Sequence, residues 1–286
     1  MPQPQTALVT GCSSGIGRAT ALRLHAAGYT VFATARKPET LAELAALGLR
    51  TLALDVTDPE SVDAAVTAVE EGHGSVDVLV NNAGYGLSGT FEETALDRVR
   101  EQFETNVFGL VALTQRVLPG MREAGRGTVV NVSSIFGKYA VPGGGFYHAS
   151  KHAVEALSDA LRLEVAGFGI RVVLVEPGPV HTPWGQTFMD HLPPAATREN
   201  SPYRTFHERT AAYYDAIYNG TRRTLAGTFT ITAEQVAEAI GRAVRARRPR
   251  TRYPVGLLAA STIALRRLAP DRVFDGAFVK RQFPVP

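Results

Sequence analysis

Short apolar runs rich in β-branched residues alternate with longer segments of helical periodicity over the first two thirds of the chain. The first run, TALVT, begins at Thr6, and the last, IRVVLVEPG, begins at Ile170. Strands that alternate with helices build βαβ units, and these form a parallel sheet with helices on both faces. The nearly continuous apolar character of the runs agrees with such double burial. The sequence therefore predicts an α/β fold with a doubly wound parallel sheet.

No linker, low-complexity tract or internal repeat divides the 286 residues, so we expect a single domain spanning residues 1–286. The alternation of predicted strands and helices ends after Gly178, and residues 181–229 form an irregular stretch rich in aromatic residues. Ligands of doubly wound sheets bind at the carboxyl ends of the strands. We therefore expect residues 181–229 to be an insertion, largely helical, that covers a substrate.

Composition narrows the class of protein. The 30 basic and 27 acidic residues leave a net charge of only +3, which gives no sign of nucleic-acid binding. A basic run from Arg242 suits either a solvated helix end or an anion patch. Cys12 is the only cysteine, which excludes an intramolecular disulfide and favours a reducing compartment. The seven histidines lack metal-ligand spacing, so no metal site is expected.

Apolar stretches are too short for a membrane span. The longest candidate, VGLLAASTIAL from Val255, falls well below the roughly 20 residues required. The amino terminus has no basic segment before its apolar run and does not resemble a signal peptide. We expect a cytoplasmic protein without an integral membrane segment.

A glycine-rich turn, TGCSSGIGR from Thr10, follows the first predicted strand and opens the first predicted helix. Gly11, Gly15 and Gly17 permit a tight turn and a close backbone approach, and the helix amino terminus attracts a pyrophosphate. By itself such a stretch is often only a turn. Its place between a strand and a helix favours dinucleotide binding.

The end of the second predicted strand bears on the choice of cofactor. Ala35 stands where an acid would bind a ribose 2′-hydroxyl, and Arg36 and Lys37 follow it. A cation without an acid suits a 2′-phosphate and so favours NADP(H) over NAD(H). The alternative is an exposed basic turn, because the glycine turn offers no second supporting arginine.

The stretch YHASK places Tyr147 and Lys151 one helical turn apart, on one face of a predicted helix. A phenol and an ammonium at that spacing can influence each other's protonation. Alone, the pair is ordinary on a helix surface.

Several motifs occur together in an order that resembles the short-chain dehydrogenase/reductase family. They are TGCSSGIG, LDVTD, NNAG, TNVFG, NVSS, YHASK and EPGPVHT, and they cover roughly residues 6 to 182. The stretches FATARKP and TNVFG are most similar to those of the branch that contains 17β-hydroxysteroid and retinol dehydrogenases. The resemblance implies a Rossmann fold and an oxidoreductase acting on a carbonyl or alcohol. It also implies a homodimer or homotetramer formed through the long helices around residues 95–125 and 146–166.

The resemblance also assigns catalytic roles. Ser134 precedes Tyr147 by 13 residues, which is the spacing in the family. Tyr147 would exchange a proton with the substrate oxygen, and Ser134 would donate a hydrogen bond to that oxygen. Lys151, together with the oxidised nicotinamide, would lower the pKa of Tyr147 and bind the ribose hydroxyls. Asn106 would hold a water that links Lys151 to solvent.

Cofactor contacts follow by the same resemblance. Asp55 would meet the adenine and the backbone near Asn82 the adenosine side, although Asn82 is equally suited to stabilising a strand end. Pro177 begins the stretch expected near the nicotinamide. The full expected set is Gly11, Ser13, Ser14, Gly15, Ile16, Gly17, Arg36, Asp55, Val56, Asn82, Ala83, Gly84, Tyr147, Lys151, Pro177, Gly178, Val180 and Thr182.

Other residues near these motifs are not expected to take part. His148 and His152 lie one position along the helix from Tyr147 and Lys151, which turns their side chains about 100° away. Cys12 is expected to be a small filler inside the glycine turn.

The substrate is expected to be lipophilic: a ketone, an aldehyde, or a steroid-like or retinoid-like alcohol. The insertion offers aromatic and other large side chains that could line an apolar pocket or simply form core. These are Trp184, Phe188, Met189, Tyr203, Phe206, Tyr213, Tyr214 and Tyr218. The glycines of VPGGG, Gly144 above all, are expected to make a mobile loop that leaves room beside the reacting carbon.

Two alternatives to an NADP(H)-dependent oxidoreductase remain at this stage. One is an NAD(H)-preferring dehydrogenase of the same family. The other is a non-catalytic dinucleotide-sensing protein, since a fold does not guarantee activity. The presence of Asn106, Ser134, Tyr147 and Lys151 together favours an enzyme, because a sensor has no need of all four.

Overall fold

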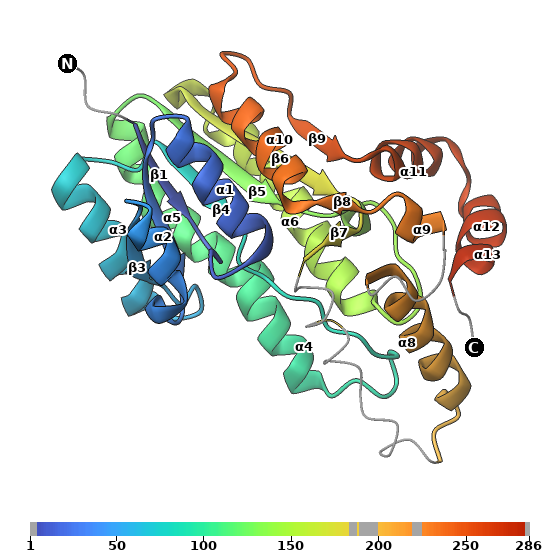
Figure 1. Cartoon of the computed structure of the whole chain (residues 1–286). Helices are drawn as coiled ribbons and strands as arrows, with labels where there is room; N and C mark the ends of the chain where they lie inside the picture. The colour runs from blue at the N-terminus through green and yellow to red at the C-terminus, as the bar shows by residue number, and fades with distance from the viewer. Residues whose placement is uncertain (1–4, 183–187, 189–199, 219–224, 284–286) are drawn as a thin grey trace.

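A computed structural model describes residues 5–182, 188, 200–218 and 225–283 of the chain (Figure 1). Seven strands form one parallel sheet in the order β3-β2-β1-β4-β5-β6-β9. They are β1 (Thr6–Val9), β2 (Thr30–Ala35), β3 (Arg50–Ala53), β4 (Val78–Asn81), β5 (Gly127–Val132), β6 (Ile170–Pro177) and β9 (Arg252–Val255). A short parallel pair joins β7 (Val180–His181) to β8 (Ile231–Thr232).

Helices cover both faces of this sheet, so the predicted doubly wound, single-domain Rossmann-type fold is confirmed (Figure 1). The helices that follow the strands are α1 (Gly15–Ala26), α2 (Ala42–Ala46), α3 (Pro59–His73), α4 (Leu96–Phe103), α5 (Gly109–Glu123) and α6 (Gly145–Glu164). Later in the chain come α8 (Arg204–Tyr218), α9 (Leu225–Thr228), α10 (Ala233–Arg245), α11 (Leu257–Leu268), α12 (Asp271–Phe274) and α13 (Lys280–Gln282).

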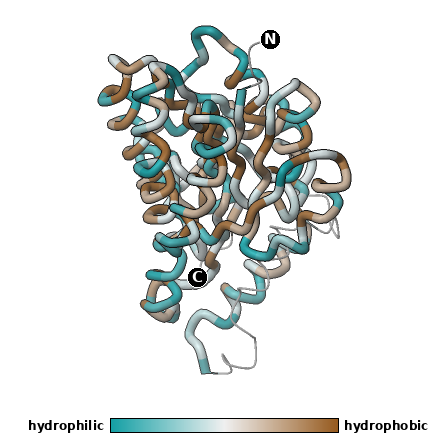
Figure 2. The backbone as a smooth tube through the Cα atoms, turned by 90° about the vertical axis from the view of Figure 1, so that its left-hand side faces the viewer, coloured by the Kyte–Doolittle hydropathy of each residue, from teal (hydrophilic) through white to brown (hydrophobic). Residues whose placement is uncertain are grey.

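Successive residues of each strand point to opposite layers, as a pleated backbone requires. In β1, Ala7 and Val9 belong to the core beneath α1 and α10, whereas Leu8 belongs to the core beneath α3 and α5. Apolar stretches accordingly gather at the centre of the molecule and hydrophilic ones on the outer turns of the helices (Figure 2). Burial on both faces explains why the strands read as nearly continuous apolar runs.

The strand order reverses direction at β1, which pairs with β2 on one side and with β4 on the other. The connections from these two neighbours leave toward opposite faces of the sheet. A crevice therefore opens at the carboxyl ends of β1 and β4, which is where doubly wound proteins bind their ligands.

The carboxyl-terminal helices add a separate wall beyond β9, at the end of the molecule opposite β3 (Figure 1). They pack on the segment between β5 and α6 through a cluster of buried apolar residues. Its members are Ile135, Tyr139, Val141, Ala259, Ile263, Phe274, Phe278 and Val279. Within the described part of the chain, no helix has both the length and the apolar character needed to cross a membrane.

Candidate active site

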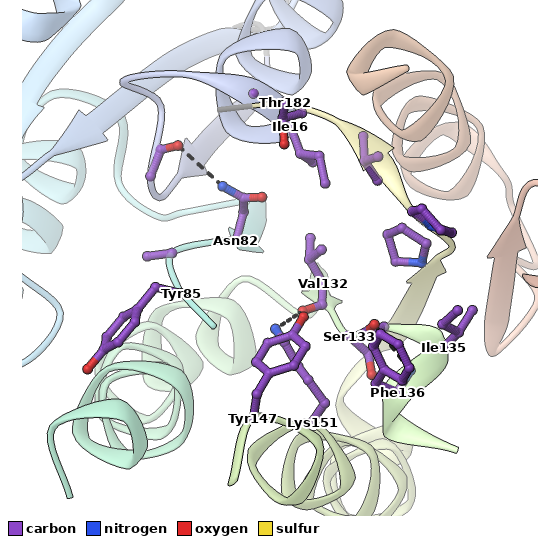
Figure 3. A pocket seen from close by; sticks show the side chains of 18 of the residues that line it. Ile16, Asn82, Tyr85, Val132, Ser133, Ile135, Phe136, Tyr147, Lys151 and Thr182 are labelled. Carbon is purple, nitrogen blue, oxygen red and sulfur yellow. Dashed lines mark hydrogen bonds between the residues drawn. The ribbon is translucent and has the colours of Figure 1, made fainter. Parts of the chain in front are cut away.

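A cavity of about 410 Å³ lies at the carboxyl ends of the strands (Figure 3). Most residues predicted for the site line it, from loops that are far apart in the sequence. They are Gly11, Ser13, Ser14, Gly15, Ile16, Arg36, Asp55, Val56, Asn82, Ala83, Gly84, Ser134, Tyr147, Lys151, Pro177, Gly178, Val180 and Thr182. Two predicted residues, Gly17 and Asn106, lie behind the wall rather than in it.

The glycine turn after β1 depends on the absence of side chains. Gly11 and Gly15 have φ values of +69° and +55°, in the left-handed region that favours glycine. A Cβ on Gly17 would lie 2.2 Å from the carbonyl oxygen of Gly11 and 2.6 Å from Nδ2 of Asn82. Gly17 therefore lets α1 pack against its own entry turn, and its role is structural rather than one of direct contact with a ligand.

The side chain of Asn82 fastens the end of β4 to this turn. Its Nδ2 donates to the carbonyl oxygens of Thr10 at 2.9 Å and Gly11 at 3.3 Å, and its backbone N donates to Oγ1 of Thr10. Asn82 thus acts as the strand-end stabiliser that the sequence allowed. It also lines the cavity, so the two interpretations are compatible.

The amino terminus of α1 is suited to an anion. Its first turn contains no acidic residue, and the Ser14 side chain makes no capping hydrogen bond in the described structure. The first backbone N–H groups of a helix lack intrahelical partners and carry the positive end of its dipole. They face the cavity beside Gly15 and Ile16, which is where a pyrophosphate would fit.

Arg36 also lines the cavity and is exposed just after β2, and the uncharged Ala35 stands where an acid would bind a ribose 2′-hydroxyl. Asp55 follows β3, and its carboxylate accepts hydrogen bonds from N and Oγ1 of Thr57 at 2.9 and 2.7 Å. A cation and a locally fixed carboxylate thus flank the adenosine end of the predicted dinucleotide site.

Tyr147 and Lys151 project from the first turns of α6 into the middle of the cavity (Figure 3). Both side chains are buried, and Nζ of Lys151 lies 5.9 Å from the centroid of the Tyr147 ring. The same Nζ donates a 2.8 Å hydrogen bond to the carbonyl oxygen of Val132 on β5. Ser134, two residues beyond Val132, hydrogen-bonds to Tyr147.

Burial dominates the protonation of this pair. It raises the pKa of Tyr147 to about 12, against a smaller opposing effect of the hydrogen bond from Ser134. It lowers the pKa of Lys151 to about 8, although the Glu155 carboxylate partly counteracts this. In the polypeptide alone, desolvation of the phenolate therefore sets the pKa of Tyr147. The lowering expected from Lys151 together with the oxidised nicotinamide stays a prediction.

Asn106 sits in a π-helical turn, Glu104–Phe108, between α4 and α5. Its Oδ1 accepts from the backbone N of Tyr85 at 3.0 Å, and its Nδ2 donates to the carbonyl oxygen of Tyr85 at 2.9 Å and to Oγ of Ser150 at 3.1 Å. Asn106 thus ties the segment after β4 to α6. A Cβ on Gly84 would lie 2.9 Å from that Oδ1, which explains the glycine there.

The neighbouring histidines face away from the reaction centre, as predicted. His148 packs against Phe136 and accepts a hydrogen bond from the backbone N of Val141, and burial lowers its pKa to about 3. Neither His148 nor His152 lines the cavity. Cys12 is fully buried, and burial raises the pKa of its thiol to about 12, which agrees with a filler role.

The glycines of VPGGG do not border the cavity, so the expectation that they leave space beside the reacting carbon is wrong. A Cβ on Gly144 would lie 2.5 Å from the imidazole ring of His148. A Cβ on Gly143, whose φ is +80°, would lie 3.1 Å from Phe206. The absence of side chains at Gly143 and Gly144 instead lets α8 and His148 pack against the segment before α6.

The remaining part of the cavity is aromatic. Of the candidates from the insertion, Tyr213, Tyr214 and Tyr218 of α8 line it, whereas Phe188, Tyr203 and Phe206 do not. Trp184 and Met189 lie outside the described residues. Sequence reasoning missed further lining residues that have no local signal beyond being apolar. They are Ile135, Phe136, Tyr139, Ile217, Leu258, Phe278 and Phe283.

A buried ionic cluster behind α6 was also missed. Glu155, one turn beyond Lys151, and Glu176 at the end of β6 both pair with Lys138 and Arg252. Burial and the nearby Glu155 carboxylate raise the pKa of Glu176. The cluster ties α6, β6 and β9 together next to Pro177, which lines the site.

Residues 5–192 match the family model for short chain dehydrogenases, which covers more than half of the chain. The chain belongs to the short-chain dehydrogenase/reductase family. The narrower branch of 17β-hydroxysteroid and retinol dehydrogenases remains a prediction.

Relatives of this family resemble the chain over nearly its whole length. The uncharacterized oxidoreductase YbbO of Escherichia coli is 36% identical over 95% of this chain and 93% of its own. The NADPH-dependent 3-dehydrocapnine reductase of Ornithobacterium rhinotracheale is 36% identical over 96% of both chains. The crystal structure of a short-chain dehydrogenase from Streptomyces avermitilis is 34% identical, covers 98% of both chains and superposes with a TM-score of 0.78.

Replacing Gly17 should test the packing of the glycine turn. We expect Gly17→Ala to lower the free energy of unfolding by about 1–3 kcal/mol or more, because its methyl group meets backbone atoms that cannot move away. Denaturant unfolding measures this effect. Gly167→Ala is the matched control, since a Cβ added at that position would meet no other atom within 4 Å. Equal stability of the two variants would contradict the proposed close approach.

Proposed function

We propose that this protein is an NADP(H)-dependent oxidoreductase that transfers a hydride between nicotinamide and a carbonyl or alcohol group of a lipophilic substrate. The observation that carries the proposal is the convergence of Ser134, Tyr147 and Lys151 at the middle of one cavity. On one side lie the glycine turn and the amino terminus of α1, and on the other lie the aromatic residues of α8 and the carboxyl-terminal helices.

In the direction of reduction, Tyr147 donates its phenolic proton to the carbonyl oxygen of the substrate. A phenol is already protonated at neutral pH, and burial raises the pKa of Tyr147 further, so the proton is present when it is needed. Ser134 stabilises the developing negative charge on the same oxygen by a hydrogen bond. When bound, the reduced nicotinamide supplies the hydride.

Lys151 has two tasks in this proposal. Its ammonium stabilises the phenolate left on Tyr147 and offers hydrogen bonds to ribose hydroxyls. Asn106 positions these groups by joining Tyr85 to Ser150 of α6, and we retain for it the role of holding a water that connects Lys151 to solvent. The buried Glu155 favours the charged form of Lys151, which serves both tasks.

The preference for NADP(H) rests on Arg36. An exposed guanidinium borders the cavity where an acid would otherwise bind the 2′-hydroxyl, and such a group forms charge-assisted hydrogen bonds with a phosphate. The O. rhinotracheale relative is named as an NADPH-dependent reductase, which supports the same choice. An NAD(H)-preferring dehydrogenase and a non-catalytic dinucleotide sensor are the alternatives that the experiments below separate.

A lipophilic substrate is favoured by the aromatic half of the cavity. Tyr213, Tyr214 and Tyr218 present apolar rings with polar hydroxyl groups, and Phe278 and Phe283 add purely apolar surface. Such a lining suits a long or bulky carbonyl compound that carries some polar groups near the reacting carbon. We also propose a cytoplasmic homodimer or homotetramer.

Removing the phenolic hydroxyl should abolish turnover. We expect Tyr147→Phe to lower kcat by at least about a hundredfold, because the substrate oxygen then lacks its proton donor. The dissociation constant for NADPH should change little. Steady-state assays with a hydrophobic ketone and a fluorescence titration measure the two effects. Tyr253→Phe, on β9 outside the cavity lining, is the matched control, and retained turnover in Tyr147→Phe would refute the role.

Neutralising Arg36 should remove the preference for the 2′-phosphate. We expect Arg36→Ala to raise the dissociation constant for NADPH by about 10- to 100-fold and to leave that for NADH unchanged. Arg248→Ala removes another exposed cation and serves as the control. Equal affinity of the unaltered protein for both cofactors would overturn the NADP(H) assignment, and binding without turnover of any carbonyl would favour the sensor.

The rate of reduction should depend on pH through Lys151. The protonated ammonium is the required form, and a pKa of about 8 means that it is lost as the pH rises above that value. We expect kcat/KM for reduction to be flat from about pH 6 and to fall about tenfold per unit above about pH 8. Lys151→Arg should move this decline to higher pH, since arginine stays charged. A profile without any decline up to about pH 10 would contradict the assignment.

A further inference from the structure

One face of α11 is apolar and exposed to solvent. The exposed fractions of Leu257, Leu265 and Leu268 are 69%, 45% and 85%. Leu257, Ala264 and Leu268 recur with helical period and so lie along one stripe of the helix, with Leu265 at its edge. A stripe of large aliphatic residues on the surface marks an interaction site more often than scattered single residues do.

The opposite side of the same helix belongs to the interior. Ala259 and Ile263 pack into the cluster with Phe274 and Phe278, and Leu258 lines the cavity described above. Helix α11 therefore forms a thin wall between the aromatic half of the cavity and the outside of the molecule, at the end farthest from β3 (Figure 1). Whatever the exposed stripe contacts lies close to the substrate side of the site.

Basic residues outnumber acidic ones in the sequence around the stripe. Residues 257–283 contain five basic and only two acidic residues. Arg266 pairs with Asp271 and lies over the ring of Phe274, so it is engaged within the protein. Arg267, Arg272, Lys280 and Arg281 are exposed, as is Val273 between them in sequence. Exposed leucines bordered by cations form the pattern of a helix that lies in an anionic membrane interface.

We propose that this surface, defined as Leu257, Leu265, Leu268 and Val273 with their neighbouring cations, docks onto an anionic lipid bilayer. The inference rests on the proposed function, since a lipophilic substrate would partition into the bilayer and enter the cavity beside α11. Docking inserts the leucines below the headgroups, while Arg267 and Arg272 contact lipid phosphates. The protein remains peripheral, because a helix of 12 residues is too short to cross the bilayer.

A second copy of this chain fits the surface less well. A two-fold contact brings the same patch of two subunits together, so the exposed cations around one α11 would face those around the other. Like charges at an interface oppose association, whereas anionic lipids neutralise them. Charge complementarity therefore favours the bilayer.

Vesicle binding tests the proposal directly. The full chain is sedimented with vesicles of phosphatidylcholine alone or with about a third phosphatidylglycerol. We expect strong binding only to the anionic vesicles, weakened by salt. Leu257→Asp with Leu268→Asp should weaken it at least about tenfold, since each change removes a large apolar side chain from the interface. Leu47→Asp, at a 56% exposed leucine just after α2 and outside the helices expected to join subunits, is the matched control and should bind as the unaltered protein does.

Two further measurements distinguish a failure of the docking proposal from a failure of the proposed function. Reduction of a small water-soluble ketone should be unchanged in the Leu257 and Leu268 double variant, so loss of vesicle binding is not mistaken for loss of the active site. If the unaltered protein reduces no carbonyl but binds vesicles, the proposed function fails and the docking surface stands. Absence of binding to anionic vesicles overturns the docking proposal. It is also overturned if light scattering shows that the double variant has lost a dimer while its vesicle binding persists.

Discussion

The joint between the glycine turn and the end of β4 holds the rest of the site in place. Oγ1 of Thr10 accepts hydrogen bonds from the backbone N of both Asn82 and Ala83, and the Asn82 amide returns two bonds to the turn. Gly17 allows α1 to close over this joint. The crevice at the switch of strand order is thereby fixed in width, and it presents unpaired helix N–H groups to a ligand.

Desolvation sets the chemistry within that crevice. The phenol of Tyr147 and the ammonium of Lys151 are both buried, and burial shifts each pKa toward the neutral form. The phenol is thus protonated at neutral pH, and the pKa of Lys151, about 8, lies near neutrality. The Glu155 carboxylate, one turn further along α6, opposes part of the shift of Lys151.

The substrate side of the cavity is built from different elements than the cofactor side. Its wall is assembled from α8, α11 and the residues after α12, which pack on the segment between β5 and α6. Such a wall can vary without disturbing the sheet, which is consistent with a common fold that serves many substrates. The same helices carry the cationic, leucine-rich surface, so access to the cavity and contact with a bilayer would be decided by one structural unit.

The sequence alone determined the doubly wound sheet, the glycine turn and the proximity of Tyr147 to Lys151. These depend on local periodicity, on backbone freedom and on spacing within one helix. The tertiary structure decided what depends on distant segments: that Gly17 and Asn106 support the wall rather than line it, that Gly144 faces His148, and that Phe278 and Phe283 reach the substrate side. It also decided the protonation of Tyr147, because burial is a property of the packed molecule and not of any short stretch of chain.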